Sequence, residues 1–163
     1  MTSPIFALAD EYITSFARLH PMVAGSIGIT GDFGVASDLG PDAEAERAQL
    51  ARDTLARLGA LESTGSADDL ARLHMTERLE SQLALHDAGE WRRALRVPYG
   101  FLQSLCSYVD LAPRGTEDQW RTTAARIRAI PEMLATWRRT MDAGIAAGQT
   151  VAKRQVAEGV KQA

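Results

Sequence analysis

The sequence predicts an all-α protein, a bundle-like array of six or seven helices within 163 residues. Three observations support this fold class. Apolar residues recur every three or four positions over most of the chain, which is the period of an amphipathic helix. Prolines, glycines and capping residues separate the periodic segments from one another. No segment alternates apolar and polar residues for long enough to predict a strand.

The first predicted helix follows Ser3 and Pro4, a capping residue and a proline at the first helical position. It is expected to end at His20, because the residue before a proline disfavours the helical conformation. Its apolar stripe consists of Ile5, Leu8, Tyr12, Phe16 and Leu19. Residues 21–41 contain five glycines and two prolines, so a long Gly-rich loop is expected after this helix.

A second helix is expected from Pro41, with acidic residues placed favourably against its dipole. A third is expected after the hinge at 63–66, where Ser66 and Asp69 resemble a capping box. Gly89 marks its end. The predicted apolar stripes are Leu50, Leu55, Leu58 and Leu61 in the second helix, and Leu70, Leu73, Leu79 and Leu83 in the third.

Beyond residues 98–100 we expect a short apolar helix and then one capped by Thr116. Pro131 is expected either to start a further helix or to kink this one. Thr150 is expected to cap a last, polar helix. Tryptophans at helical spacing with aliphatic residues predict buried faces on both sides of Pro131. The face before it consists of Trp120, Ala124, Ile127 and Ile130, and the face after it of Met133, Leu134, Trp137, Met141 and Ile145.

Composition restricts the class of protein. The length suits one domain, so residues 1–163 are expected to form a single all-helical unit. One cysteine excludes a disulfide scaffold and multi-cysteine zinc modules. No apolar run approaches the roughly 20 residues of a membrane-spanning helix. Acidic Asp10 and Glu11 precede the first basic residue, which argues against a signal peptide. The expected setting is the cytoplasm, without membrane association.

The net charge of −3 conceals an asymmetry. Residues 1–90 hold 15 acidic and six basic side chains, whereas residues 91–163 hold six acidic and 12 basic ones. Such a split is typical of two complementary helical halves or of a docking face. A nucleic-acid partner is not expected, because the chain as a whole is acidic.

The sequence contains no convincing catalytic or binding motif. The glycines at 25–34 lack the Gly-Lys-Ser/Thr of a phosphate-binding loop, so they are interpreted as a turn-rich loop. His74, Glu77 and Glu80 share a helix face but have no second copy, so a solvated face is expected rather than a metal site. Cys106 falls within an apolar stripe and is interpreted as a buried, inert thiol.

One stretch mixes basic and aromatic residues, as nucleic-acid surfaces do: Trp91, Arg92, Arg93, Arg96 and Tyr99. A contact between this stretch and acidic residues elsewhere in the fold is the simpler interpretation. No catalytic, cofactor-binding or metal-binding residue is therefore assigned from the residues themselves.

Several stretches occur in a recognisable order: Phe6–Tyr12, His20 with Pro21, Asp38 with Leu39, Ala71–Leu73, Glu77–Gly89, Leu102–Leu105, Trp120, Ala125–Pro131, Gly144, Gly148 and Ala152–Val156. In this order they resemble the N-terminal region of a bacterial family known as domain of unknown function 885, whose members look like zinc-dependent peptidases. The resemblance implies a metal-binding His/Glu/His motif in a C-terminal helical part that this chain does not contain. No residue here matches that motif, so zinc is expected only in that part.

Two functions are compatible with this resemblance. In the first, the chain is the non-catalytic helical N-terminal portion of a metallopeptidase-like hydrolase, and it shapes a substrate cleft or docks on the metal-bearing part, as a fragment or as one of two chains. In the second, it is a free-standing helical binding or oligomerisation module without enzymatic activity, and a second copy is a possible partner. Whether the chain takes part in an enzyme is left open by the sequence.

Overall fold

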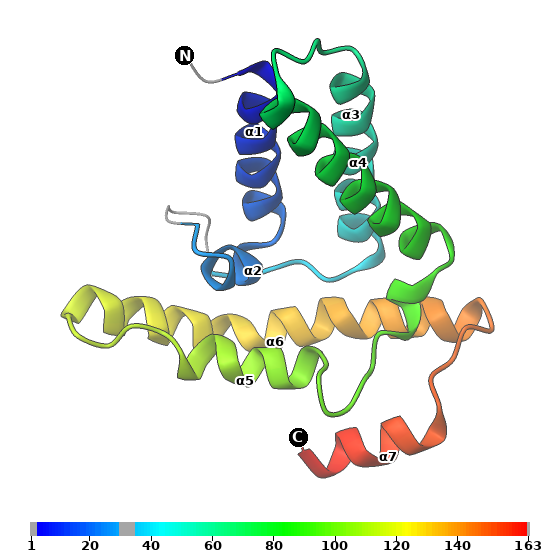
Figure 1. The fold of residues 1–163 in the computed structure, drawn as a ribbon. Coiled ribbons are helices and arrows are strands. Elements are labelled where there is room, and N and C mark those ends of the chain that lie inside the picture. The colour runs from blue at the N-terminus through cyan, green and yellow to red at the C-terminus, as the bar shows by residue number, and fades with distance from the viewer. Residues whose placement is uncertain (1–2, 30–34, 163) are drawn as a thin grey trace. The chain divides into compact units, whose positions relative to one another are not determined.

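A computed structural model of the chain describes residues 3–29 and 35–162 (Figure 1). Within these ranges it contains seven α-helices, one 3-10 helix and no strand, which confirms the all-α prediction. In the same ranges no helix combines the length and the apolar character needed to cross a membrane. The elements are α1 (Pro4–Leu19), α2 (Pro21–Ser26), α3 (Pro41–Gly59), α4 (Ser66–Asp87), η1 (Glu90–Arg93), α5 (Phe101–Asp110), α6 (Glu117–Ala146) and α7 (Lys153–Gln162).

The chain divides into two compact units. Unit 1 comprises Met1–Phe33 and Asp42–Ala88, and unit 2 comprises Gly34–Pro41 and Gly89–Ala163. The division follows the charge asymmetry of the sequence: unit 1 holds 13 acidic and six basic side chains, and unit 2 holds eight acidic and 12 basic ones. The expectation that residues 1–163 form a single domain stays a prediction, which the unfolding experiments described below address.

The amino ends of α1 and α4 in unit 1 are linked by hydrogen bonds among side chains. Ser3 caps α1, as predicted, and its hydroxyl accepts a hydrogen bond from Phe6 N at 3.3 Å. The predicted capping box at Ser66 and Asp69 is wrong, because Gly65 occupies the cap position of α4. Asp68 reaches back instead and accepts hydrogen bonds from the amide and hydroxyl of Thr64 at 2.8 and 2.6 Å. Hydrogen bonds from Ser3 and Thr64 lower the pKa of the Asp68 carboxyl.

The core of unit 1 joins α1, α3 and α4. Ile5, Leu8 and Leu58 are buried at its centre, and partly buried neighbours pack against them: Leu61, Ala71 and Met75. Arg72 of α4 donates to the carbonyls of Leu58 and Leu61, both at 2.6 Å. These two bonds satisfy carbonyls at the end of α3 that have no partner within the helix. The end of α3 is thereby fixed against α4.

The predicted stripe of α4 is only partly buried. Leu79 is 2% exposed, whereas Leu70 and Leu73 are 55% and 64% exposed. Leu85, which the prediction did not include, is 58% exposed. At 100° per residue, the three exposed leucines lie within about 120° of the helix circumference, on the side opposite Leu79. Helix α4 therefore has one buried side, and its exposed leucines lie on the opposite side, which also carries the exposed His74 and Glu77.

The Gly-rich segment begins with a helix that the sequence did not predict. Pro21–Ser26 form α2, since Pro21 stands at a position where a proline initiates a helix. His20 thus ends α1, as predicted, and also precedes the first residue of α2. Gly28 follows with a φ of 76°, the left-handed conformation that favours glycine. Residues 30–34 of the predicted loop lie outside the described residues.

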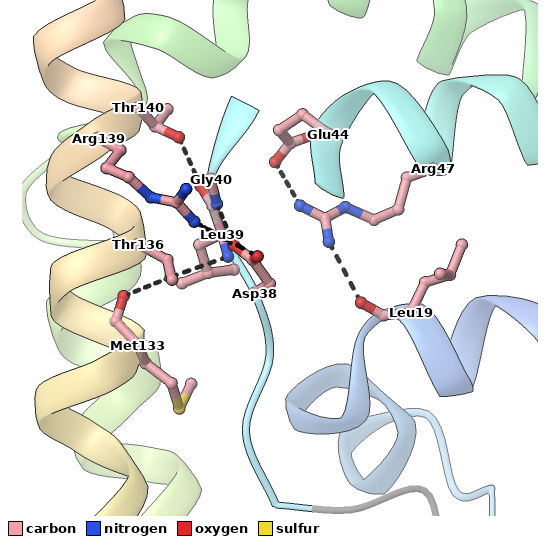
Figure 2. Close-up of polar contacts among 10 residues, drawn as sticks. All are labelled: Leu19, Asp38, Leu39, Gly40, Glu44, Arg47, Met133, Thr136, Arg139 and Thr140. Carbon is pink, nitrogen blue, oxygen red and sulfur yellow. Dashed lines mark hydrogen bonds and ion pairs between the residues drawn. The ribbon is translucent and has the colours of Figure 1, made fainter. Parts of the chain in front are cut away.

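Arg47 of α3 is buried at the end of α1 (Figure 2). Its guanidinium donates to the carbonyl of Leu19 at 3.2 Å and to the carboxylate of Glu44 at 2.9 Å. Burial, together with the positive charge of Arg47, lowers the pKa of the neighbouring His20 imidazole to about 4. His20 is therefore neutral at physiological pH.

In unit 2, helix α6 is continuous over 30 residues. Thr116 caps it as predicted: its hydroxyl accepts from Gln119 N, and the Gln119 side chain accepts from Thr116 N, both at 3.3 Å. Pro131 lies inside the helix and does not start a new one.

The buried residues of α6 are only partly those predicted. Met133 is buried as predicted, and Thr123, Thr140 and Gly144 are buried without having been predicted. Trp120, Ile127 and Ile145, which were expected inside, are 54%, 51% and 66% exposed. The prediction failed for these three because apolar residues occur on more than one side of α6. Trp137, which was expected in the core, is partly buried, and its ring contacts Phe101 of α5 at a centroid distance of 5.0 Å.

Helix α5 packs on α6 through Leu105 and Tyr108. Arg126 of α6 donates to the carbonyl of Tyr108 at 2.9 Å, and its guanidinium lies 4.3 Å from the centre of the Tyr108 ring. Cys106 is exposed, which corrects the predicted buried thiol. Residues 105 and 108 are three positions apart and lie on the same face of α5. Position 106 is rotated by roughly 100° from residue 105, which turns Cys106 away from that face.

Residues 35–40 lie along α6 as an extended strap (Figure 2). The hydroxyl of Thr136 accepts from Leu39 N at 3.1 Å, and the hydroxyl of Thr140 donates to the Leu39 carbonyl. Asp38 accepts from Gly40 N at 2.7 Å and forms an ion pair with Arg139 at 3.4 Å. Leu39 itself is buried, so both of its backbone polar groups require partners, and two threonines one helical turn apart supply them.

The substitution Thr140→Val is expected to destabilise unit 2 by about 1–2 kcal/mol, because it leaves the buried Leu39 carbonyl without its threonine donor. All three tryptophans lie in unit 2, so denaturant unfolding followed by tryptophan fluorescence measures this unit specifically. Thr122→Val is the matched control, since that hydroxyl is exposed on the same helix and bonds only the carbonyl one turn back. Equal midpoints for the two variants would show that the strap is not held in this way.

Candidate functional site

The residues considered as metal ligands lie on the surface of α4. His74, Glu77 and Glu80 are all exposed, in agreement with the predicted solvated face. Over residues 3–29 and 35–162, no group of three or more His, Cys, Asp or Glu side chains is arranged to hold a metal ion. The candidate site is instead a cavity in unit 2, which is lined by charged and apolar side chains.

The cavity is a depression open to solvent, with a volume of about 250 Å³, and lies where η1 and the segment after it meet the start of α7. Its walls come from two stretches of sequence more than 50 residues apart. The first supplies Glu90, Arg93, Leu95 and Arg96, and the second supplies Thr150, Val151, Ala152 and Gln155.

Gln149 and Gln155 hold the two walls together. Gln149 accepts a hydrogen bond from Arg92 at 2.9 Å, and Gln155 accepts one from Val97 N at 2.7 Å. Helix α7 begins at Lys153 and not after Thr150, so the predicted cap is wrong. Thr150, Val151 and Ala152 are left in an irregular segment and line the cavity.

Close backbone packing behind the cavity depends on Gly144. A Cβ atom at this position would lie 2.5 Å from the Arg92 carbonyl oxygen and 2.9 Å from the Gln149 carbonyl oxygen. The absence of a side chain lets the end of α6 contact both η1 and the segment before α7. The cavity walls are therefore backbone elements in direct contact, which limits their relative movement.

We expect Gly144→Ala to destabilise unit 2 by about 2 kcal/mol, because the new methyl group meets two backbone oxygens that cannot move independently. Gly159→Ala in α7 is the control, since its Cβ would lie at an ordinary contact distance of 3.6 Å from Leu95. That control is expected to be neutral or slightly stabilising. The measurement is unfolding followed by tryptophan fluorescence, and a Gly144→Ala variant as stable as wild type would contradict the packing described here.

The charges of the cavity consist of one carboxylate and two guanidinium groups. Arg93 forms an ion pair with Glu90 one turn before it, and this hydrogen bond lowers the pKa of Glu90 and raises that of Arg93. The positive charge of Arg96 lowers the pKa of Glu90 further. The carboxylate is therefore ionised, and the cavity carries one excess positive charge from Arg93 and Arg96.

The basic and aromatic stretch identified in the sequence contributes to this site in part. Arg93 and Arg96 line the cavity, whereas Arg92 stacks over Trp91 at 4.5 Å and bonds Gln149. Tyr99 is 89% exposed and is not among the lining residues. Sequence reasoning missed the second wall, because Val151 and Gln155 carry no signal of a site until the fold places them beside Arg96.

One comparison with known proteins gives a match. The model of a family described as "Bacterial protein of unknown function (DUF885)" matches residues 21–163. The matched region contains α2 to α7 and the whole of the cavity lining. No curated protein matches the chain.

Proposed function

Because the chain belongs to the DUF885 family of proteins of unknown function, we propose that it is the non-catalytic helical portion of a metallopeptidase-like hydrolase and docks on the metal-bearing part. The match covers most of the chain and all helices after α1. The metallopeptidase-like role and the docking go beyond what the family description states. They rest on the resemblance of the sequence and on one structural observation, the apolar surfaces that each unit leaves uncovered.

The first of these surfaces is the outer row of α4, formed by Leu70, Leu73 and Leu85. These side chains are all more than half exposed, whereas Leu79 on the opposite side is buried. Leu70 and Leu73 lie one turn apart, and the exposed His74 and Glu77 separate them from Leu85 on the same side of the helix. A single exposed leucine is ordinary on a protein surface, but an adjacent pair such as Leu70 and Leu73 offers a small apolar contact for another element.

The second surface is the outer row of α6, formed by Trp120, Ile127 and Ile145. At 100° per residue these positions lie within about 20° of one another, along roughly 37 Å of helix. The exposed ion pair of Arg138 and Asp142 lies on the same side of α6 between Ile127 and Ile145, so the apolar part of the row runs from Trp120 to Ile127. Exposed aromatic and aliphatic residues in that part suit contact with a helix. We propose that the metal-bearing part covers at least one of the two rows.

The experiment that tests this proposal starts from the coding DNA beyond the codon for Ala163. The metal-bearing part is a segment with a His/Glu/His motif, encoded either in the same reading frame or in the neighbouring gene. This segment is expressed as a separate protein. We expect the two proteins to form a one-to-one complex. Replacing both Leu70 and Leu73 by Ser is expected to weaken it roughly a hundredfold, because each leucine contributes about 1.5 kcal/mol when buried.

The control is Leu111→Ser, which removes an 82% exposed leucine from outside both rows. It is expected to leave the affinity within a factor of two. Equal affinities for Leu111→Ser and the double variant would show that α4 is not part of the interface. The corresponding double variant of α6, Trp120→Ser with Ile127→Ser, then tests that helix. If no metal-bearing segment binds, the docking proposal is wrong.

The same rows suit the second candidate function, a helical module that associates with itself. Sedimentation of the purified chain distinguishes the two functions. A monomer at micromolar concentration supports docking on a different protein. A dimer that dissociates when Leu70 and Leu73 are replaced by Ser supports the oligomerisation module instead.

A further inference from the structure

The cavity in unit 2 is separate from the surfaces assigned to docking. None of its lining residues belongs to the outer rows of α4 and α6. Ligand binding in this cavity is therefore independent of the proposed docking, and it can be tested on the isolated chain.

Arg96 is the residue of the cavity that is available to a ligand. The guanidinium of Arg93 is engaged by Glu90. That of Arg96 makes no hydrogen bond to residues 3–29 or 35–162, and its electrostatic partner there is Glu90, whose carboxylate already bonds Arg93. An arginine side chain presents donors in a planar fork, and the planar carboxylate matches that geometry.

The rest of the lining combines three apolar residues with the polar side chains of Thr150 and Gln155. Leu95, Val151 and Ala152 contribute side chains that cannot hydrogen-bond, and the polar Gln155 is occupied by Val97 N. A volume of about 250 Å³ lies below the range of about 300–1,000 Å³ for drug-sized ligands, so the occupant is small. We propose that this cavity binds a small monocarboxylate with an apolar body, whose carboxylate pairs with Arg96 and whose apolar body contacts Leu95 and Val151.

The charge balance of the cavity favours a monoanion. Two guanidinium groups and one carboxylate leave a single positive charge, which one carboxylate neutralises. A dianion such as phosphate has a second charge with no partner, and it faces the carboxylate of Glu90. A neutral ligand has no charge to pair with the guanidinium of Arg96.

The test uses N-acetyl-leucine as the carboxylate and N-acetyl-leucinamide as its neutral counterpart. Each is titrated into the isotope-labelled chain, and amide chemical shifts are followed by NMR. We expect N-acetyl-leucine to shift the signals of Leu95, Val97 and Val151 with a millimolar Kd, and the amide to leave them in place. Arg96→Gln is expected to weaken binding roughly tenfold, the value for one charge-assisted hydrogen bond of about 1.5 kcal/mol.

Arg128→Gln is the matched control, because it removes one exposed arginine from α6 of the same unit and changes the net charge equally. It is expected to leave the Kd within a factor of two. Equal weakening in the two variants would show that the net charge alone attracts the ligand. Shifts of the same size with the amide, or stronger binding of inorganic phosphate, would contradict a monocarboxylate site.

Discussion

Lowering the pH from 8 to 5 is expected to reduce the free energy of unfolding of unit 1 by about 2 kcal/mol through His20 alone. Burial and the charge of Arg47 lower the pKa of this imidazole from 6.5 to about 4 in the folded chain. As the pH falls below 6.5, the unfolded chain binds a proton that the folded chain does not. Stability is therefore constant above pH 6.5, declines between pH 6.5 and 4, and has lost about 3 kcal/mol by pH 4.

His20→Phe is expected to abolish this decline, because phenylalanine keeps a ring beside Phe16 and cannot be protonated. Hydrogen exchange in α1 measures unit 1, which contains no tryptophan. Working above pH 5 avoids most of the range in which carboxylates with lowered pKa, those of Glu11 and Asp68, lose their stabilising effect. His74→Gln, which removes an exposed imidazole, should keep the decline. An equal decline in wild type and His20→Phe would mean that another group carries the pH dependence.

The substitution Leu58→Ala is expected to destabilise unit 1 by about 3 kcal/mol, the cost of truncating a fully buried leucine and leaving a cavity. Leu58 is 1% exposed and packs with Ile5 and Leu8, so its removal weakens the contact between α3 and α1. Hydrogen exchange in α1 and α4 should accelerate accordingly. A matched truncation, Leu70→Ala, deletes the same atoms from a 55% exposed side chain and should cost under about 0.5 kcal/mol.

These two leucine variants also address the organisation of the chain. If residues 1–163 unfold as a single domain, Leu58→Ala will shift the tryptophan fluorescence transition of unit 2 together with the exchange in unit 1. If the two compact units unfold separately, only unit 1 will respond. A Leu58→Ala effect as small as that of Leu70→Ala would contradict the core assigned to unit 1.

Helix boundaries were the most predictable part of this fold, because local chemistry determines them. Ser3 and Pro4 at α1, Pro41 at α3, and Thr116 with Gln119 at α6 act through their own hydrogen bonds or fixed φ angles. The ends of α4 and α7 were less predictable. The amino end of α4 has no side-chain cap, since Asp68 bonds Thr64 before the helix, and Thr150 lines a cavity.

The buried faces were harder to predict than the boundaries. Periodicity shows that α4 and α6 have apolar residues, but these occur on more than one side of each helix, and only tertiary packing selects the side that is buried. The sequence pattern therefore placed Trp120 and Ile127 in the interior, where the structure has Thr123 and Thr140. The misassigned residues are largely those of the outer rows, on which the docking proposal rests.

The cavity in unit 2 illustrates a further limit of sequence reasoning. Arg93 and Arg96 were noticed as part of a basic stretch, but their ligand-binding role depends on Val151 and Gln155. More than 50 residues separate the two walls, and Gly144 and Gln149 bring them together through backbone contacts. No local pattern at 149–155 predicts such a contact.

Zinc content and peptide hydrolysis of the purified chain test the central proposal most directly. The chain is dialysed against micromolar zinc, its bound metal is measured, and a mixed peptide library is then offered as substrate. If the chain is the non-catalytic portion of a hydrolase, it will retain far less than one zinc per chain and cleave no peptide. Its complex with the metal-bearing part will bind zinc and cleave peptides. One tightly held zinc per isolated chain, together with peptide cleavage, would contradict this account.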